Sequence, residues 1–251
     1  MKIVDTLEQT LGGGFKGLHG EVVTEDCYRI TKLDFEPDVV FDIGGNVGTF
    51  TRHARSLFAN ARIVAVEPHK ENSIHFRKFT NMENVTLLDA ALGNGRIHHM
   101  NGAVNGAHEV YLSVGLGYTQ ELFDTNPVAA PVGVKSMSLA DIVLPHYESG
   151  MKAVLKIDCE GGENCLWEDE ESLKLMRRFD YIAIELHYHV AHGGFSDDVH
   201  RITNAALDSF DATHECHRGR IYFTARKKAR EQKPKPNQII GDNESSNPIP
   251  S

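Results

Sequence analysis

The chain has 251 residues, of which 41% are hydrophobic and 24% charged, with a formal net charge of −9. This composition is typical of a globular protein and allows one large α/β domain. The negative charge argues against a nucleic-acid groove, so we expect no nucleic-acid partner. No apolar run approaches the roughly 18 residues of a membrane span, and the first residues do not resemble a signal peptide. The four cysteines lack paired spacing, so we expect reduced thiols in a cytoplasmic protein without a membrane partner.

Residues 39–51 read VVFDIGGNVGTFT, which predicts a buried strand, a glycine turn and the start of a helix. The dinucleotide pattern G-x-G-x-x-G fails here, because Asn46 and Thr49 occupy the positions of its later glycines. Asp42 at the strand end would repel a pyrophosphate but suits a cofactor that carries an ammonium group. We therefore predict that Asp42, Gly44, Gly45 and Asn46 bind S-adenosyl-L-methionine; a loop that only turns the chain is the alternative.

The next two predicted strands, 61–66 and 84–88, also end in residues suited to an adenosine. Glu67 follows Asp42 by 25 residues, at a strand end where a carboxylate can accept hydrogen bonds from both ribose hydroxyls. Asp89 is a candidate acceptor for the adenine amino group, and Ala90 would leave room for the ring. A solvated loop carboxylate is the alternative interpretation of Glu67.

Further strands are predicted at 109–114, 132–135, 153–157, 181–189 and 220–224, and helices at 50–58, 138–143, 168–178 and 196–210. This alternation indicates an α/β fold. We divide the chain into an N-terminal cap segment (1–38), with strand-like pieces at 22–23 and 28–30, a catalytic domain (39–225) and a polar tail (226–251). The tail has no periodicity, and we expect it to be disordered.

A second cluster of chemical groups follows the strand at 153–157. Asp158 and Glu160 come directly after it, and Glu185, His187 and His189 alternate along the next strand and so share one face. Because ligands bind at the carboxyl ends of parallel strands, we expect these carboxylates and imidazoles to converge. Asp158, Glu185 and the two histidines are also metal-ligand types, but Mg²⁺ prefers oxygen ligands. A divalent metal is therefore the less favoured alternative, and we assign no metal ligand.

These motifs together resemble the FkbM-type methyltransferases. The resemblance rests on VFDIGGNVG (40–48), VEP (66–68), ALG (91–93), SLAD (138–141) and LKIDCEGGE (155–163). It implies a Rossmann-like class I methyltransferase fold, with a mostly parallel seven-stranded sheet and helices on both faces. It also implies that Asp42, Gly44 and Asn46 line the methionine part of the cofactor and Glu67 its ribose, with Asp158 and Glu160 beside the sulfonium and the acceptor. Gly45 stands where the family usually has alanine.

The sequence thus predicts an S-adenosylmethionine-dependent O-methyltransferase that releases S-adenosyl-L-homocysteine. The acceptor would be a hydroxyl of a sugar, a glycan or a small natural product, as the resemblance implies. For proton removal we predict His187 or Asp158 as the base, oriented by Glu160 and Glu185. A nicotinamide-dependent oxidoreductase and a non-catalytic cofactor-binding module are the alternatives.

Overall fold

A seven-stranded sheet forms the centre of the molecule. The structure, a computed structural model, describes residues 14–93, 97–101, 111–113, 132–159, 163, 166, 169–186, 210–217 and 220–227. The strand order is β10-β11-β9-β8-β1-β2-β3, and the five strands from β9 to β3 run parallel, whereas β11 is antiparallel to both of its neighbours. Their bounds are β1 Val39–Ile43, β2 Arg62–Val66, β3 Val85–Leu88, β8 Ala153–Ile157, β9 Tyr181–Leu186, β10 Phe210–His217 and β11 Arg220–Lys227.

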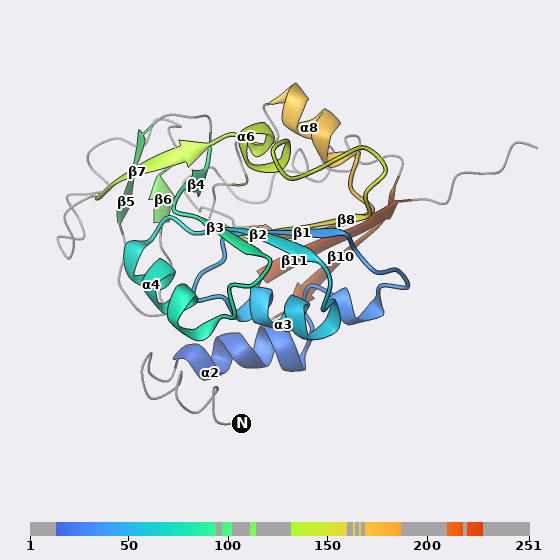
Figure 1. The fold of residues 1–251 in the computed structure, drawn as a ribbon, viewed down its shortest axis with the longest axis horizontal. Helices are drawn as coiled ribbons and strands as arrows, with labels where there is room; N and C mark the ends of the chain where they lie inside the picture. Colours follow the sequence, from blue (N-terminus) through green and yellow to red (C-terminus); the bar gives the residue numbers. More distant parts are fainter. Residues whose placement is uncertain are drawn as a thin grey trace, which may run out of the picture.

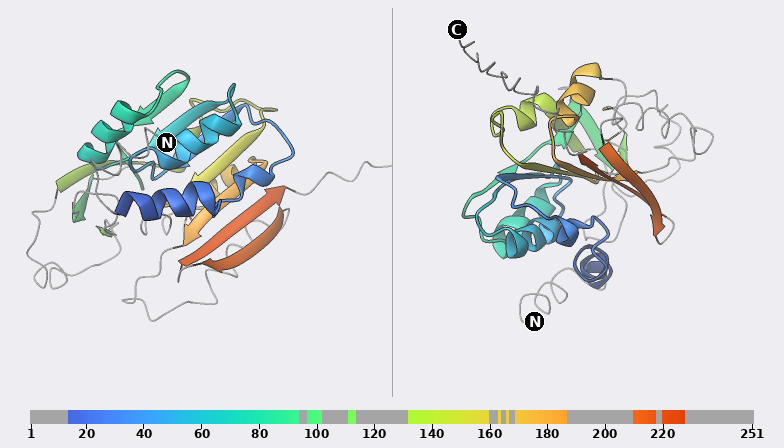
Figure 2. Two further views of the ribbon diagram at one scale, coloured as in Figure 1. Left: turned by 90° about the horizontal axis from the view of Figure 1, so that it is seen from below. Right: turned by 90° about the vertical axis from the view of Figure 1, so that its right-hand side faces the viewer.

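Helices cover both faces of this sheet, as predicted (Figure 1). Helices α6 and α8 lie on one side, and α2, α3 and α4 lie on the other (Figures 1 and 2). Their bounds are α2 Gly14–His19, α3 Thr49–Leu57, α4 Lys70–Phe79, α6 Leu139–Val143 and α8 Glu170–Met176. The mostly parallel, doubly covered sheet confirms the predicted Rossmann-like architecture. No helix in the part of the chain that the structure describes is long and apolar enough to cross a membrane.

A smaller sheet lies beside β3, in the order β4-β7-β5-β6 (Figure 1). Its strands are β4 Ala91–Leu92, β5 Ile97–Asn101, β6 Tyr111–Ser113 and β7 Val132–Met137. The sequence predicted β6 and β7, where apolar and polar residues alternate, but neither β4 nor β5.

The strands are buried on both faces, because alternate residues pack into two separate cores. Val39, Phe41 and Ile43 of β1 contact the layer formed by α6 and α8. Val40 faces the other way, into a core shared with Phe50 of α3 and with the segment that precedes β1. The register of the sheet is therefore fixed by apolar packing on either side.

The segment before β1 is helical where the sequence predicted strand-like pieces. A π-helix covers Gly20–Thr24 and a 3₁₀-helix covers Ile30–Lys32. Asp26 and Arg29 have φ of 48° and 54°, which an extended strand does not allow. The apolar side chains of this segment are buried by packing on the sheet face rather than by pairing at an edge, which explains the wrong prediction.

At the other end of the domain, the predicted helix over 196–210 meets β10, which begins at Phe210; residues 196–209 lie outside the described part. The predicted domain boundary at 225 falls within β11, which ends at Lys227. The predicted tail lies almost wholly outside the described residues, and the division into segments stays a prediction.

Gly44 is the position where the fold depends most clearly on a missing side chain. Its φ is +81°, and a Cβ atom there would lie 1.7 Å from the carbonyl oxygen of Asp158. We predict that Gly44→Ala lowers the stability by about 4 kcal/mol or prevents folding, since the backbones at Gly44 and Asp158 are both held in the sheet and its loops. Urea denaturation measures this loss.

Gly150→Ala is the matched control, because Gly150 also has a positive φ (+98°) but nothing lies within 4 Å of its would-be Cβ. We expect Gly150→Ala to lose only about 1–2 kcal/mol of stability, which is the cost of a left-handed backbone for a residue that has a Cβ atom. Equal losses in the two variants would show that the approach of Gly44 to Asp158 is not a tight constraint.

Candidate active site

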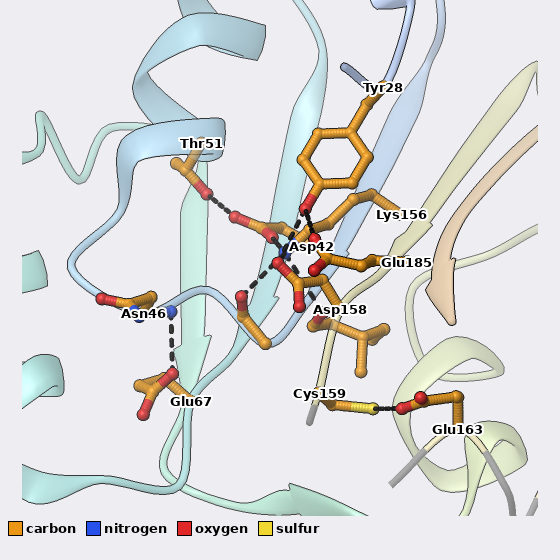
Figure 3. A network of polar contacts seen from close by, with 12 residues as sticks. Tyr28, Asp42, Asn46, Thr51, Glu67, Lys156, Asp158, Cys159, Glu163 and Glu185 are labelled. Atoms are coloured by element: carbon orange, nitrogen blue, oxygen red, sulfur yellow. Dashed lines mark hydrogen bonds and ion pairs between the residues drawn. The ribbon is translucent and has the colours of Figure 1, made fainter. Parts of the chain in front are cut away.

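Charged residues end three neighbouring strands on one face of the sheet. Asp42 of β1, Lys156 of β8 and Glu185 of β9 lie on the face that α3 covers, and Asp158 follows β8 directly (Figure 3). Asp42 and Lys156 are register partners across the parallel pair β1–β8. Because parallel strands carry their carboxyl ends to one edge, these groups meet where ligands bind in such folds.

Lys156 is the only cation among the residues labelled in Figure 3, and it is buried. Its Nζ lies 3.1 Å from Oδ1 of Asp42 and 3.7 Å from Oδ2 of Asp158, and it donates a hydrogen bond to the carbonyl oxygen of Gly44 at 2.8 Å. Burial acts to lower the pKa of Lys156, but Asp42 and Asp158 outweigh it and hold that pKa above its ordinary value. Lys156 therefore stays charged and joins the loops that follow β1 and β8.

Asp42 is fully enclosed, with none of its surface exposed. Besides Lys156, it accepts a hydrogen bond from Thr51 Oγ1 at 2.7 Å, which ties the end of β1 to the first turns of α3. The predicted contact of Asp42 with the methionine part of a cofactor stays a prediction. The geometry gives Asp42 a supporting position behind the glycine loop.

The glycine loop is held from its other side by the end of β2. The amides of Gly44 and Gly45 both donate to the carbonyl oxygen of Val66, at 2.9 and 2.8 Å. The amide of Asn46, which has a left-handed backbone (φ 48°), donates to Oε2 of Glu67 at 2.7 Å. The sequence singled out the loop and Glu67, and the structure brings them together directly.

Glu67 is buried, and each of its carboxylate oxygens accepts hydrogen bonds from the protein. Oε1 accepts from the amide of His69 at 2.8 Å and from the side chain of Asn72 at 3.2 Å. Burial raises the pKa of Glu67 to about 7, and these hydrogen bonds, together with the one from Asn46, oppose the rise. The predicted hydrogen bonds to ribose hydroxyls stay a prediction; each oxygen still has lone pairs to offer.

A tyrosine joins the carboxylates that follow β8 and end β9. The hydroxyl of Tyr28 donates to Oδ2 of Asp158 at 2.7 Å and lies 3.4 Å from Oε2 of Glu185 (Figure 3). The structure thus brings Asp158 and Glu185 together, as the strand pattern predicted. Asp158 retains 21% exposure of its side chain, whereas Lys156 and Glu185 are buried, so Asp158 is the acid of this group that can reach a ligand.

The remaining predicted residues are placed less centrally or lie outside the described part. Asp89 is largely exposed and forms a bidentate salt bridge with Arg77, whose two terminal nitrogens lie 3.0 and 2.9 Å from its carboxylate oxygens. This salt bridge holds the pKa of Asp89 below its ordinary value. Ala90 beside it is buried. Glu160 and His187 lie outside the described residues. Their roles, and the adenine contact of Asp89, stay predictions.

Sequence reasoning did not assign Lys156, Thr51 or Tyr28 to the site. Lys156 carried a signal, because a lysine inside the apolar run AVLKI must be buried and needs a carboxylate partner. For Thr51 and Tyr28, a single sequence gives no signal that would have placed them in the site. Among the described residues, no three histidine, cysteine, aspartate or glutamate side chains gather in a way that could hold a metal ion. Because His187 and His189 are not among them, the absence of a metal stays a prediction.

Comparison with known proteins matches this chain to a family. The model of the methyltransferase FkbM domain matches residues 42–223. The 31-O-demethyl-FK506 methyltransferase FkbM of Streptomyces tacrolimicus is 27% identical over 184 residues, which cover 63% of this chain and 69% of that protein.

Solved structures of methyltransferases match this chain at low similarity. A precorrin-6y C5,15-methyltransferase from Geobacter metallireducens has a TM-score of 0.42 at 16% identity, over 79% of this chain and 84% of that one. Fibrillarin from Aeropyrum pernix, solved with natively bound S-adenosyl-L-methionine, has a TM-score of 0.45 at 12% identity, over 82% and 76%.

The sheet order is that of the Rossmann-like class I methyltransferase fold. Within that class, the family match covers most of the chain, from β1 to β11. The chain belongs to the FkbM methyltransferase domain family, which confirms the resemblance seen in the sequence.

The raised pKa of Glu67 makes a pH-dependent contribution to stability. Its folded-state pKa of about 7 exceeds its ordinary 4.5, so the native state binds the extra proton between these pH values. The contribution of neutral Glu67 is present below pH 4.5 and is lost as the pH rises to about 7. We predict that the stability of Glu67→Gln relative to wild type increases by about 3 kcal/mol as the pH rises from 4.5 to 8, because only the wild type has to ionise a buried acid.

Urea denaturation across this pH range measures the difference between the two proteins. Glu71→Gln, at an exposed position in the first turn of α4, controls for the loss of one negative charge. A stability difference between Glu67→Gln and wild type that does not change with pH would contradict the raised pKa.

Proposed function

We propose that this protein transfers a methyl group from S-adenosylmethionine to a hydroxyl of a sugar, a glycan or a small natural product. The single observation that carries this proposal is the Asp42–Lys156–Asp158 group, with Glu185 beside it, at the carboxyl edge of the sheet. It places three carboxylates around one ammonium group. Such a site favours a ligand that carries positive charge.

The residues present fit this methyl donor. Its sulfonium and ammonium groups complement the excess of carboxylates, and Asp158 is the partly exposed one. The loop at Gly44 passes so close to Asp158 that a Cβ atom would clash with the Asp158 carbonyl, so the loops after β1 and β8 lie side by side. A pyrophosphate, by contrast, would meet the partly exposed Asp158 at short range, which disfavours a nicotinamide dinucleotide.

When bound, S-adenosylmethionine supplies a methyl carbon on a cationic sulfur; the O–C bond forms as the S–C bond breaks, and its electron pair stays on sulfur. The chain's own task is to hold the acceptor oxygen in line, which is worth up to about 7–11 kcal/mol of the barrier. Asp158 or His187 accepts the hydroxyl proton, and Glu160 and Glu185 orient this base. Such a base contributes roughly 10²–10⁴-fold.

The choice of an oxygen acceptor is supported by the curated relative. That protein is named as a methyltransferase of 31-O-demethyl-FK506, so its name places the transferred methyl on an oxygen. At 27% identity, we carry over the kind of acceptor, a hydroxyl, and not that compound. We propose that the reaction requires no divalent metal and that neither nucleic acid nor membrane is a partner.

Calorimetric titration tests the donor. We predict that the protein binds S-adenosylmethionine and S-adenosylhomocysteine and does not bind NAD. Asp158→Asn should weaken binding of the donor about tenfold and that of the product at most about twofold, because we place Asp158 beside the sulfonium, whose charge the product lacks. Asp38→Asn, an exposed residue at the opposite end of β1, is the control.

Binding of NAD without either adenosyl compound would support an oxidoreductase and contradict this proposal. Binding without turnover on a panel of sugars, phenols and other hydroxyl compounds, read by homocysteine release, would support a non-catalytic module.

A further inference from the structure

Tyr28 lies in the site although it precedes the part of the chain that matches the family, which begins at residue 42. Only 2% of its surface is exposed. Its hydroxyl points between two acids that end neighbouring strands, with the shorter contact, 2.7 Å, to Asp158 and the longer, 3.4 Å, to Glu185 (Figure 3).

Packing on three sides fixes the position of this hydroxyl. The ring of Tyr28 meets that of Phe50 edge to face, with centroids 5.4 Å apart. Lys156 Nζ lies 5.4 Å from the centre of the Tyr28 ring. The backbone carbonyl of Tyr28 accepts a hydrogen bond from the hydroxyl of Tyr181 on β9 at 2.9 Å. The tyrosine is therefore held by α3, β8 and β9 together, and its donor cannot swing away from Asp158.

The Tyr28 hydroxyl fixes the orientation of the Asp158 carboxylate. The hydroxyl has one proton, which it donates to Asp158 at the shorter distance, and a hydrogen bond to an ionised acid is stronger than one between neutral groups. With Oδ2 of Asp158 engaged by Tyr28 and facing Lys156, the carboxylate is fixed in one orientation. Asp158 keeps 21% of its side-chain surface exposed in this orientation.

We propose that Tyr28 is a positioning residue for methyl transfer, which holds the carboxylate of Asp158, and through it the donor's cationic group, in the reactive orientation. The inference rests on the proposed function. It assigns part of the site to the segment before β1, outside the residues that define the family.

A double-mutant cycle on binding of S-adenosylmethionine tests this role. Tyr28→Phe keeps the ring and removes only the hydroxyl. We expect it to weaken binding about tenfold in the wild-type background and less than twofold in the Asp158→Asn background. Tyr147→Phe is the control, because it removes a tyrosine hydroxyl that donates to the backbone carbonyl of Arg178 beside the core on the other face of the sheet, and we expect it to change binding less than twofold. Thermal unfolding of each variant establishes that it is folded.

The pH dependence of binding distinguishes this role from a purely structural one, because the loss of a purely structural contact by Tyr28 would not shift the pH profile. Tyr28 and Lys156 contact Asp158 directly. Glu185 contacts Tyr28, Asp42 contacts Lys156, and Cys27 and Glu21 of the first segment lie near this group. A hydrogen bond to the ionised form lowers the pKa of an acid, so its loss raises that pKa. The weakening of binding on acidification should therefore begin at a higher pH in Tyr28→Phe than in wild type.

The outcomes separate this inference from the proposed function. Wild-type protein that binds no S-adenosylmethionine would overturn both. Wild-type binding with equal losses from Tyr28→Phe in both backgrounds, with an unmoved pH profile, or with an equal loss from Tyr147→Phe, would overturn the role of Tyr28 alone.

Discussion

One buried ammonium group joins the two central strands of this molecule where they end. The desolvation of Lys156 costs several kcal/mol, and it is offset only because Asp42, Asp158 and the carbonyl of Gly44 surround it. Replacement of the lysine by an apolar residue would leave Asp42 enclosed without its charge partner. The interaction therefore fixes the positions of both loops that any ligand at this edge must contact.

The two faces of the sheet end differently, and this difference defines the site. On the face of α6 and α8, the strands end in Ile43, Ile157 and Leu186, which continue the apolar core. On the face of α3, the same strands end in Asp42, Lys156 and Glu185. Parallel strands buried on both sides leave little room for charge. At the carboxyl ends of these strands, charged residues nevertheless replace apolar ones. We take this replacement to mark the functional site.

Much of the fold and part of the site follow from the sequence. The apolar runs of β1, β2, β8 and β9, and the glycines between β1 and α3, define those elements locally. The meeting of Asp158 and Glu185 was predictable because strands alternate with a period of two.

What the sequence could not provide depends on contacts between distant parts of the chain. Tyr28 reaches Asp158 across 130 residues, from a segment whose left-handed turns at Asp26 and Arg29 hide its path. β10 has no apolar alternation strong enough to identify it, and the Phe210 that begins it fitted a helical pattern equally well. The pairing of Asp89 with Arg77 depends on how α4 lies against the end of β3, which spacing alone does not fix.

The central claim is that the paired ends of β1 and β8, held by Lys156, receive the methyl donor. A crystal structure of the protein with S-adenosylhomocysteine tests it most directly. The account predicts the amino-acid end of the ligand against residues 44–46, its sulfur beside Asp158 and its ribose at Glu67, with Lys156 still bonded to Asp42. A ligand bound elsewhere, or an empty crevice in protein shown by calorimetry to bind it, would contradict the account.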